Sequence, residues 1–183
     1  MNKTTKIILI ILSVALIIGL ISFIFYKNSR KEIKEYAPEE EISEEQVRET
    51  IVSLYFRNKT TKSIEPEARL IDVKKLISNP YEILINLLIQ GPKNENLEKT
   101  IPEGTILRNA KIEGETLIIN FSKEFVDNHT NGKEIEEQTI KSIVSTMTEL
   151  NEINSIKILI EGEENKGFKD DEINFKENFI RTE

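Results

Sequence analysis

Residues 79–105 read NPYEILINLLIQGPKNENLEKTIPEGT, and this stretch decides the fold that we expect. Asn79 is a good helix N-cap, and Pro80 suits the first helical position because its missing N–H is not needed there. Gly91 can adopt the left-handed conformation that closes a helix, and Pro92 cannot continue one. The sequence therefore predicts a helix that begins and ends between these two pairs of residues.

Apolar side chains occupy most directions around this predicted helix. Its polar residues Glu82, Asn86 and Gln90 recur every four residues and so form one narrow line. A helix with this pattern is buried on most of its circumference, so a second layer besides a sheet has to cover it. The loop 93–104 and the phenylalanine-containing C-terminal tail are the segments available for this cover.

The N-terminal part contains one long apolar segment, Ile7–Tyr26, which follows a short tail, residues 1–6. Twenty helical residues match a hydrocarbon core about 30 Å thick, so we expect this segment to be a transmembrane helix and the membrane to be a partner. The alternative is a cleavable signal peptide, whose apolar region is shorter, about 7–15 residues, and is followed by small residues. Here Lys27 follows directly, which favours a retained anchor.

Basic residues flank this segment unequally. The positions are Lys3 and Lys6 before it, and Lys27, Arg30, Lys31 and Lys34 after it. By the positive-inside rule the count slightly favours a cytoplasmic C-terminal side, although the second cluster can instead lie against anionic lipid head groups. Residues 27–48 read as a charged juxtamembrane linker, because the acidic run 37–46 has no aromatic residue.

The composition excludes several classes of partner and site. The net charge is −7 and the pI is about 5.1, so there is no basic face for phosphate and we expect no nucleic-acid partner. The chain contains no cysteine, which excludes a lipidated cysteine anchor and disulfide bonds. A metal site would depend on His129 and carboxylates alone. We therefore expect no metal and no cofactor.

Residues 49–183 are predicted to form one α+β domain of order β-β-α-β-β-α-β, with both helices on one face of a single sheet. The second helix is expected over Lys133–Leu150, and the five strands over Ile51–Phe56, Ala68–Val73, Thr105–Ile112, Glu115–Phe121 and Ser155–Glu161. Alternation along the fourth strand places Leu117, Ile119 and Phe121 in the core. The tail, residues 167–183, is expected to fold back without a regular element.

The residues that catalysis would need do not converge in the sequence. His129 lies in the polar turn DNHTNG, where we expect a solvated imidazole, because a general base needs an oriented partner. We therefore expect no catalytic residue and predict that the chain is not an enzyme. Two alternatives stay open: an envelope enzyme with a cleft near Asp127, His129 or Glu161, and a glycan-binding domain that acts on the cell wall.

One positive feature concerns strand positions that should point away from the helices. Tyr55, Ile118 and Leu159 occupy such positions in the predicted sheet. An apolar patch on the open face of a sheet marks a protein interface, whereas isolated surface apolar residues need no explanation. These three residues are the candidate partner contacts.

An ordered series of short segments resembles the GerM (GerMN) domain family of sporulation and spore germination. The segments are Leu54-Tyr55-Phe56, Glu67-Ala68-Arg69, Leu87-Leu88 with Gly91-Pro92, Ile101–Thr105, Asn120–Phe125, Ser142–Glu149 and Ile158–Gly162. Each segment alone is unspecific, but their order across nearly the whole folded part is much stronger.

This resemblance implies a non-catalytic, extracytoplasmic domain with a fold similar to ring-building motifs, which associate side by side. It implies a single-pass protein of the cell membrane that interacts with other envelope or sporulation proteins or with a second copy of itself. On this basis we place the domain outside, despite the Lys and Arg count. Family members often carry a lipidated cysteine or two copies of the domain, whereas this chain has an apolar span and one copy.

Overall fold

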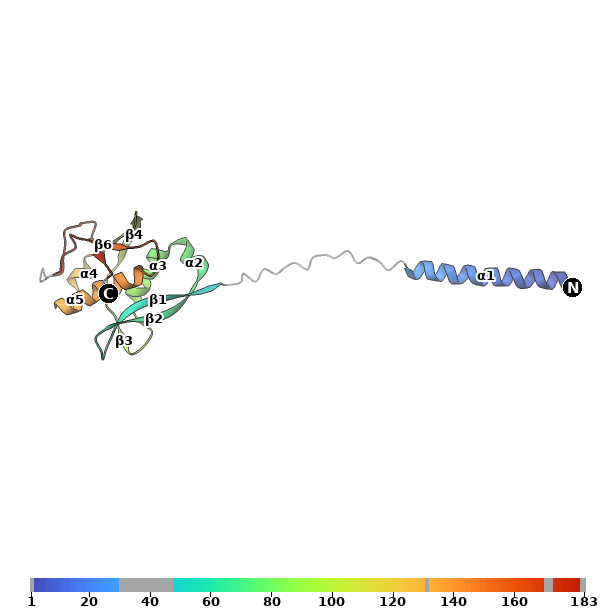
Figure 1. Ribbon diagram of the computed structural model, residues 1–183, viewed down its shortest axis with the longest axis horizontal. Helices are drawn as coiled ribbons and strands as arrows, with labels where there is room; N and C mark the ends of the chain where they lie inside the picture. The colour runs from blue at the N-terminus through green and yellow to red at the C-terminus, as the bar shows by residue number, and fades with distance from the viewer. Residues whose placement is uncertain (1, 30–47, 131, 170–172, 182–183) are drawn as a thin grey trace. The chain divides into compact units, whose positions relative to one another are not determined.

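A computed structural model describes residues 2–29, 48–130, 132–169 and 173–181, and the chain divides into two compact units, Met1–Glu45 and Gln46–Glu183 (Figure 1). The first unit contains helix α1, Lys3–Ser29. Within the described ranges, its stretch Thr5–Lys27 is the one helix long and apolar enough to cross a membrane, which fits an anchor and a signal sequence alike. The predicted linker, residues 27–48, lies mostly outside the described residues.

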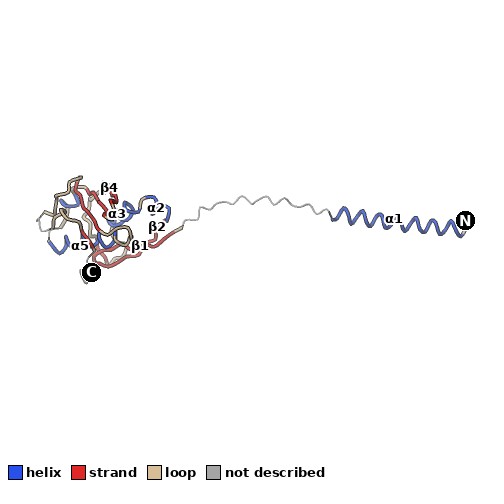
Figure 2. The backbone as a smooth tube through the Cα atoms, turned by 45° about the horizontal axis from the view of Figure 1, so that its top comes forward, coloured by secondary structure: helices blue, strands red, loops and turns tan. Residues whose placement is uncertain are grey.

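The second unit mixes strands and helices, as predicted (Figure 2). Its strands are β1 Glu49–Asn58, β2 Ile64–Asp72, β3 Leu97–Glu98, β4 Leu107–Glu113, β5 Thr116–Phe121, β6 Ser155–Ile160 and β7 Phe179–Ile180. Its helices are α2 Val73–Ser78, α3 Pro80–Gln90, α4 Glu124–Asp127 and α5 Lys133–Met147. The α+β class and the two long helices are confirmed, while α2, β3 and β7 were not predicted.

The predicted single sheet is wrong, because the strands form two sheets. One has the order β2-β1-β3 and the other β4-β5-β6-β7. In Figure 1 the β1–β2 hairpin and the β4–β6 strands lie on opposite sides of α3 and α5. Helix α3 contacts both β1 and β4, so the second layer that its apolar surface requires is the other sheet.

Hydroxyl groups of α5 explain why the sheets stay separate. The Ser142 hydroxyl donates to the carbonyl oxygen of Tyr55 over 2.5 Å, and the Tyr55 N–H donates to Thr146 Oγ1 over 3.0 Å. Ser142 and Thr146 are fully buried. The middle of β1 therefore pairs with helix side chains at the edge where a further long strand would otherwise bind.

The predicted ends of α3 are confirmed. Asn79 Oδ1 accepts a hydrogen bond from the Glu82 N–H at 3.3 Å, and Pro80 occupies the first turn. At the other end Gly91 has φ 92°, and its N–H donates to the carbonyl oxygens of Leu87 and Leu88. The loop after the helix packs back on it, because a Cβ on Gly91 would lie 2.5 Å from the Lys99 side chain.

The core follows the predicted alternation. Leu117, Ile119 and Phe121 are fully buried in β5, as predicted. The expectation that the tail has no regular element is wrong, since β7 pairs antiparallel with β6. Two tail phenylalanines, Phe168 and Phe175, surround the ring of Phe125 with centroid distances of 5.6 and 6.1 Å. The tail is thus fixed to the second sheet and α4 by aromatic packing.

Candidate functional site

The outward side of the β1–β2 hairpin carries two of the exposed large apolar side chains of the described strands. Cross-strand pairs place six side chains on this side, because directly opposed residues in an antiparallel pair point to the same face. They are Ile51 opposite Leu70, Ser53 opposite Ala68, and Tyr55 opposite Pro66. We call these six residues the hairpin face.

Two large apolar side chains dominate the hairpin face. Ile51 is 67% exposed and its cross-strand partner Leu70 is 65% exposed. Next to them Ala68 and Pro66 are exposed as well, while Tyr55 is half-buried. Complete burial of one such Ile or Leu side chain is worth about 1.5–3 kcal/mol. A partner that covered this pair would therefore gain several kcal/mol of apolar burial, offset by the cost of association.

The inward side of the same hairpin holds this face rigid. Leu54 and Phe56 are fully buried, and on β2 the side chains of Glu67 and Arg69 are only 9% and 7% exposed. These two form a salt bridge, and Arg69 Nη2 donates to the Gly91 carbonyl oxygen at 2.9 Å. The hairpin is thereby fixed to the end of α3.

Glu67 also holds the loop that follows α3. The backbone N–H groups of Lys93 and Asn94 donate to Glu67 Oε2 at 2.9 and 2.7 Å. Burial alone would raise the pKa of Glu67, but the bonds from Asn94, Arg69 and Lys93 together lower this pKa below its ordinary value. The carboxylate therefore stays ionised at neutral pH.

Tyr55 connects the hairpin face to the C-terminal segment. Its hydroxyl donates to Glu149 Oε1 at 2.8 Å, Arg181 Nη1 donates to the same oxygen at 2.9 Å, and the Arg181 guanidinium lies 5.6 Å from the Tyr55 ring centroid. Burial and the bond to Glu149 raise the pKa of Tyr55, while the bonds from Tyr55 and Arg181 lower the pKa of Glu149. Tyr55 therefore supports the hairpin face from its edge.

The other two predicted contacts lie on the second sheet, so the three residues do not share one sheet. Ile118 of β5 and Leu159 of β6 are half-buried and point away from the buried face of their strands. Ile118 is flanked by its cross-strand partners Lys111 and Lys157. A role of Tyr55, Ile118 and Leu159 in partner contact stays a prediction.

The predicted solvated loop histidine is wrong, because His129 is only 7% exposed. Its Nδ1 lies 2.8 Å from the Thr130 carbonyl oxygen, and its Nε2 lies 2.8 Å from Thr139 Oγ1. Since a carbonyl oxygen only accepts, Nδ1 carries a hydrogen. The ring also packs on Phe168 at 4.4 Å between centroids. The imidazole of His129 is therefore packed inside the domain and is not solvated.

A cavity of about 410 Å³ beside His129 is the nearest feature to the cleft that an enzyme would need. It is lined by residues of the loop 99–103 and by 128–130 and Ile135. A general acid needs a raised pKa. Five carboxyl groups, those of Glu65, Glu67, Glu124, Glu149 and Glu161, have a lowered pKa instead. In the described ranges no cluster of three or more acidic or histidine side chains could hold a metal ion.

Sequence reasoning missed the pair Ile51 and Leu70. A usable signal was present, because alternation along β1 puts Ile51 on the same side as Tyr55. The register of β2 against β1 was the missing information, since it alone places Leu70 opposite Ile51.

Two sheets around two long helices define a small α+β domain. The chain belongs to the Germane family of sporulation and spore germination, whose sequence model matches residues 53–166. All the family-like segments quoted above fall within this range. The resemblance seen in the sequence is thereby confirmed. Comparison with curated proteins gave no match.

Solved structures are similar to this chain in fold. The first GerMN domain of the sporulation protein GerM from Bacillus subtilis is 21% identical and superposes with a TM-score of 0.60, over 73% of this chain and 99% of that domain. The tandem GerMN domains of the same protein are 20% identical with a TM-score of 0.61, over 73% of this chain. This chain spans 46% of the tandem structure, so it corresponds to one domain of that pair.

Proposed function

We propose that this chain is a membrane-anchored, extracytoplasmic protein-interaction module of the sporulation or spore germination envelope, and that it is non-catalytic. GerMN domains are known as non-catalytic domains related to sporulation, and membership of the family supports the same role here. The partner class is another envelope or sporulation protein, or a second copy of the chain.

Helix α1 supports the anchor. The apolar side chains that are described are exposed along the whole length of this helix, including Leu16 at 66% and Phe25 at 74%. Side chains of this kind need a lipid environment, because their exposure to water is costly. Membership of the family, rather than the helix itself, supports a position of residues 46–183 on the outer side of the membrane. Protease treatment of intact cells tests this: digestion of the domain is expected, and full protection would overturn the extracytoplasmic placement.

The observation that carries the interaction role is the exposed cross-strand pair Ile51 and Leu70. Large apolar side chains that lie side by side on a rigid hairpin are the kind of surface that marks a protein interface. Tyr55 extends the hairpin face at one end, where it retains its predicted role as a partner contact. Ile118 and Leu159 are proposed as a second, smaller contact on the other sheet.

The test introduces charge on the hairpin face. The double variant Ile51→Lys, Leu70→Lys, expressed at native level, should lose the chemically cross-linked complexes that the unaltered chain forms in its own membranes. Ile106→Lys is the matched control, because Ile106 is also an exposed apolar residue, 54% exposed, but precedes β4 in the other sheet. Retention of the complexes by the double variant would exclude the hairpin face as the contact surface.

A further inference from the structure

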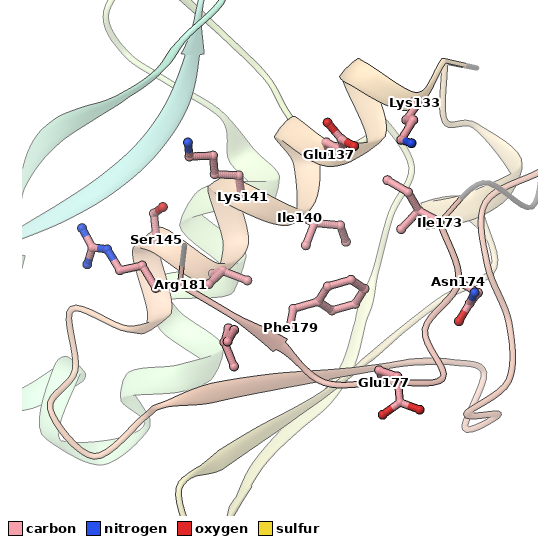
Figure 3. A pocket seen from close by; sticks show the side chains of 12 residues that line it. Lys133, Glu137, Ile140, Lys141, Ser145, Ile173, Asn174, Glu177, Phe179 and Arg181 are labelled. Atoms are coloured by element: carbon pink, nitrogen blue, oxygen red, sulfur yellow. The ribbon is translucent and has the colours of Figure 1, made fainter. Parts of the chain in front are cut away.

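A groove of about 640 Å³ lies between α5 and the C-terminal segment (Figure 3). Its centre is apolar, and Figure 3 shows Ile140, Ile173 and Phe179 pointing toward one another there. The rim carries charges of both signs, with Lys133, Glu137 and Lys141 along α5 and Glu177 and Arg181 on the other side. Half of its lining residues, from Ile173 to Arg181, lie beyond the part of the chain that the family model matches.

One wall of this groove is the edge of a sheet. Strand β7 is the last strand in the order β4-β5-β6-β7, and among the described residues it pairs with β6 alone. The Ser155 N–H of β6 donates to the carbonyl oxygen of Glu115, which precedes β5. The N–H and C=O groups of successive strand residues point to alternate sides, so those of Ile156 point toward β7. Ile156 is opposite Phe179, and therefore the N–H and C=O of the next residue, Ile180, point away from β6.

Side-chain directions at this edge are equally defined. Phe179 shares the face of buried Ile156 and points toward α5, whereas Ile180 shares the outer face with Ser155 and is 63% exposed. A strand placed beside β7 would thus alternate in the same way. Residues whose backbone bonds to Ile180 would point outward, and their neighbours would point into the apolar centre beneath α5.

We propose that this groove binds an extended peptide of another protein, which adds to the edge of β7 as a further strand. The helical wall from Lys133 to Ser145 is about 18 Å long at 1.5 Å per residue, which accommodates about five residues of extended chain. Backbone hydrogen bonds to Ile180 supply affinity that does not depend on the peptide sequence, and every second side chain of the peptide, which is apolar, fills the centre of the groove. The mixed charges of the rim favour an uncharged peptide. This site shares no residue with the hairpin face and does not depend on the function proposed for that face.

The probe is a fluorescein-labelled octapeptide of alternating valine and threonine, titrated against the full chain in detergent micelles and followed by fluorescence anisotropy. Saturable binding is expected. Ile180→Pro should weaken it roughly tenfold or more, because proline removes the free N–H and blocks the edge. Ile180→Thr, which keeps the N–H, should retain it within about twofold. Proline at position 180 removes no hydrogen bond between β7 and β6, since the Ile180 N–H points away from β6.

A pair of modified peptides tests the geometry without altering the protein. N-methylation of the threonine amides should abolish binding, because those amides face β7 when the valines point to α5. N-methylation of the valine amides should leave binding in place, since they face the other edge. The proposal is overturned if the unmodified peptide does not bind, or if either the proline variant or the threonine-methylated peptide binds normally. The variant Ile51→Lys, Leu70→Lys should bind the peptide unchanged, which separates this test from that of the hairpin face.

Discussion

Arg69 of β2 donates a hydrogen bond to the carbonyl oxygen of Gly91 across 2.9 Å in the interior of the domain. The same guanidinium pairs with Glu67, which in turn accepts hydrogen bonds from the loop after α3. Two family-like segments far apart in sequence are therefore joined by one polar network. This network fixes the angle between the hairpin, whose outer side is the hairpin face, and α3.

Removal of Arg69 should be strongly destabilising. Arg69→Met leaves the buried Glu67 carboxylate and the Gly91 carbonyl oxygen without their cationic partner, and a loss of about 3 kcal/mol in the free energy of unfolding is expected. The double variant Glu67→Gln, Arg69→Met should lose less than the sum of the single variants, because the two positions are coupled. Urea unfolding followed by circular dichroism measures both. Additive losses would show that the pair is not coupled.

Gly91→Ala should also destabilise the domain. The backbone at φ 92° disfavours any Cβ, and the new methyl group would meet the Lys99 side chain. A loss of about 1–2 kcal/mol is expected in the same urea experiment. Gly114→Asn is the control, because Gly114 has φ 62°, which asparagine tolerates, and open space around it. Equal stability of Gly91→Ala and the unaltered chain would refute this role for Gly91.

The hydroxyl of Ser142 should be essential to the edge of β1. In Ser142→Ala the buried carbonyl oxygen of Tyr55 loses its hydroxyl donor, and Thr100 Oγ1, 2.7 Å from Ser142, loses a partner too. The expected cost is about 1–3 kcal/mol. Ser145→Ala provides a comparison on the same helix, because Ser145 is also buried but lines the groove. A similar melting temperature for the two variants would contradict the account of the sheet edge.

Acid should unfold the domain partly through Glu67. Its pKa is lower in the folded chain than the ordinary 4.5, so the folded carboxyl binds its proton more weakly than the unfolded one. The resulting stabilisation is complete above about pH 4.5 and is lost as the pH falls through the lowered pKa. Glu149 acts in the same direction, through its bonds to Tyr55 and Arg181. In Glu67→Gln the stability below pH 4.5 should fall less steeply with decreasing pH, and an unchanged slope would exclude Glu67.

Local signals in the sequence were sufficient to predict the main helices and strands. The caps of α3 and the alternation of β5 depend on residues within one or two turns of each other, so Asn79, Gly91 and Leu117 could be placed correctly. The separation into two sheets could not be predicted, because it depends on hydroxyls of α5 that bond to Tyr55, some ninety residues away in sequence. Propensity and periodicity contain no information on such contacts.

Only part of the candidate site could be predicted from the sequence. Tyr55 was correctly placed on an outward strand face, but its grouping with Ile118 and Leu159 assumed one sheet. His129 was misjudged because the turn around it is polar, whereas its burial comes from Phe168 and Thr139, which belong to other parts of the chain. Long-range packing decided both outcomes.

Site-specific photo-cross-linking tests the central claim most directly. A photoreactive phenylalanine analogue is placed at Leu70, in the hairpin face, or at the control position Ile106, and the full chain is irradiated in its native membranes. The account predicts a covalent adduct with a partner protein, or with a second copy, from position 70 and not from position 106. Absence of any protein adduct from position 70, in a chain that is folded and inserted in the membrane, would contradict it.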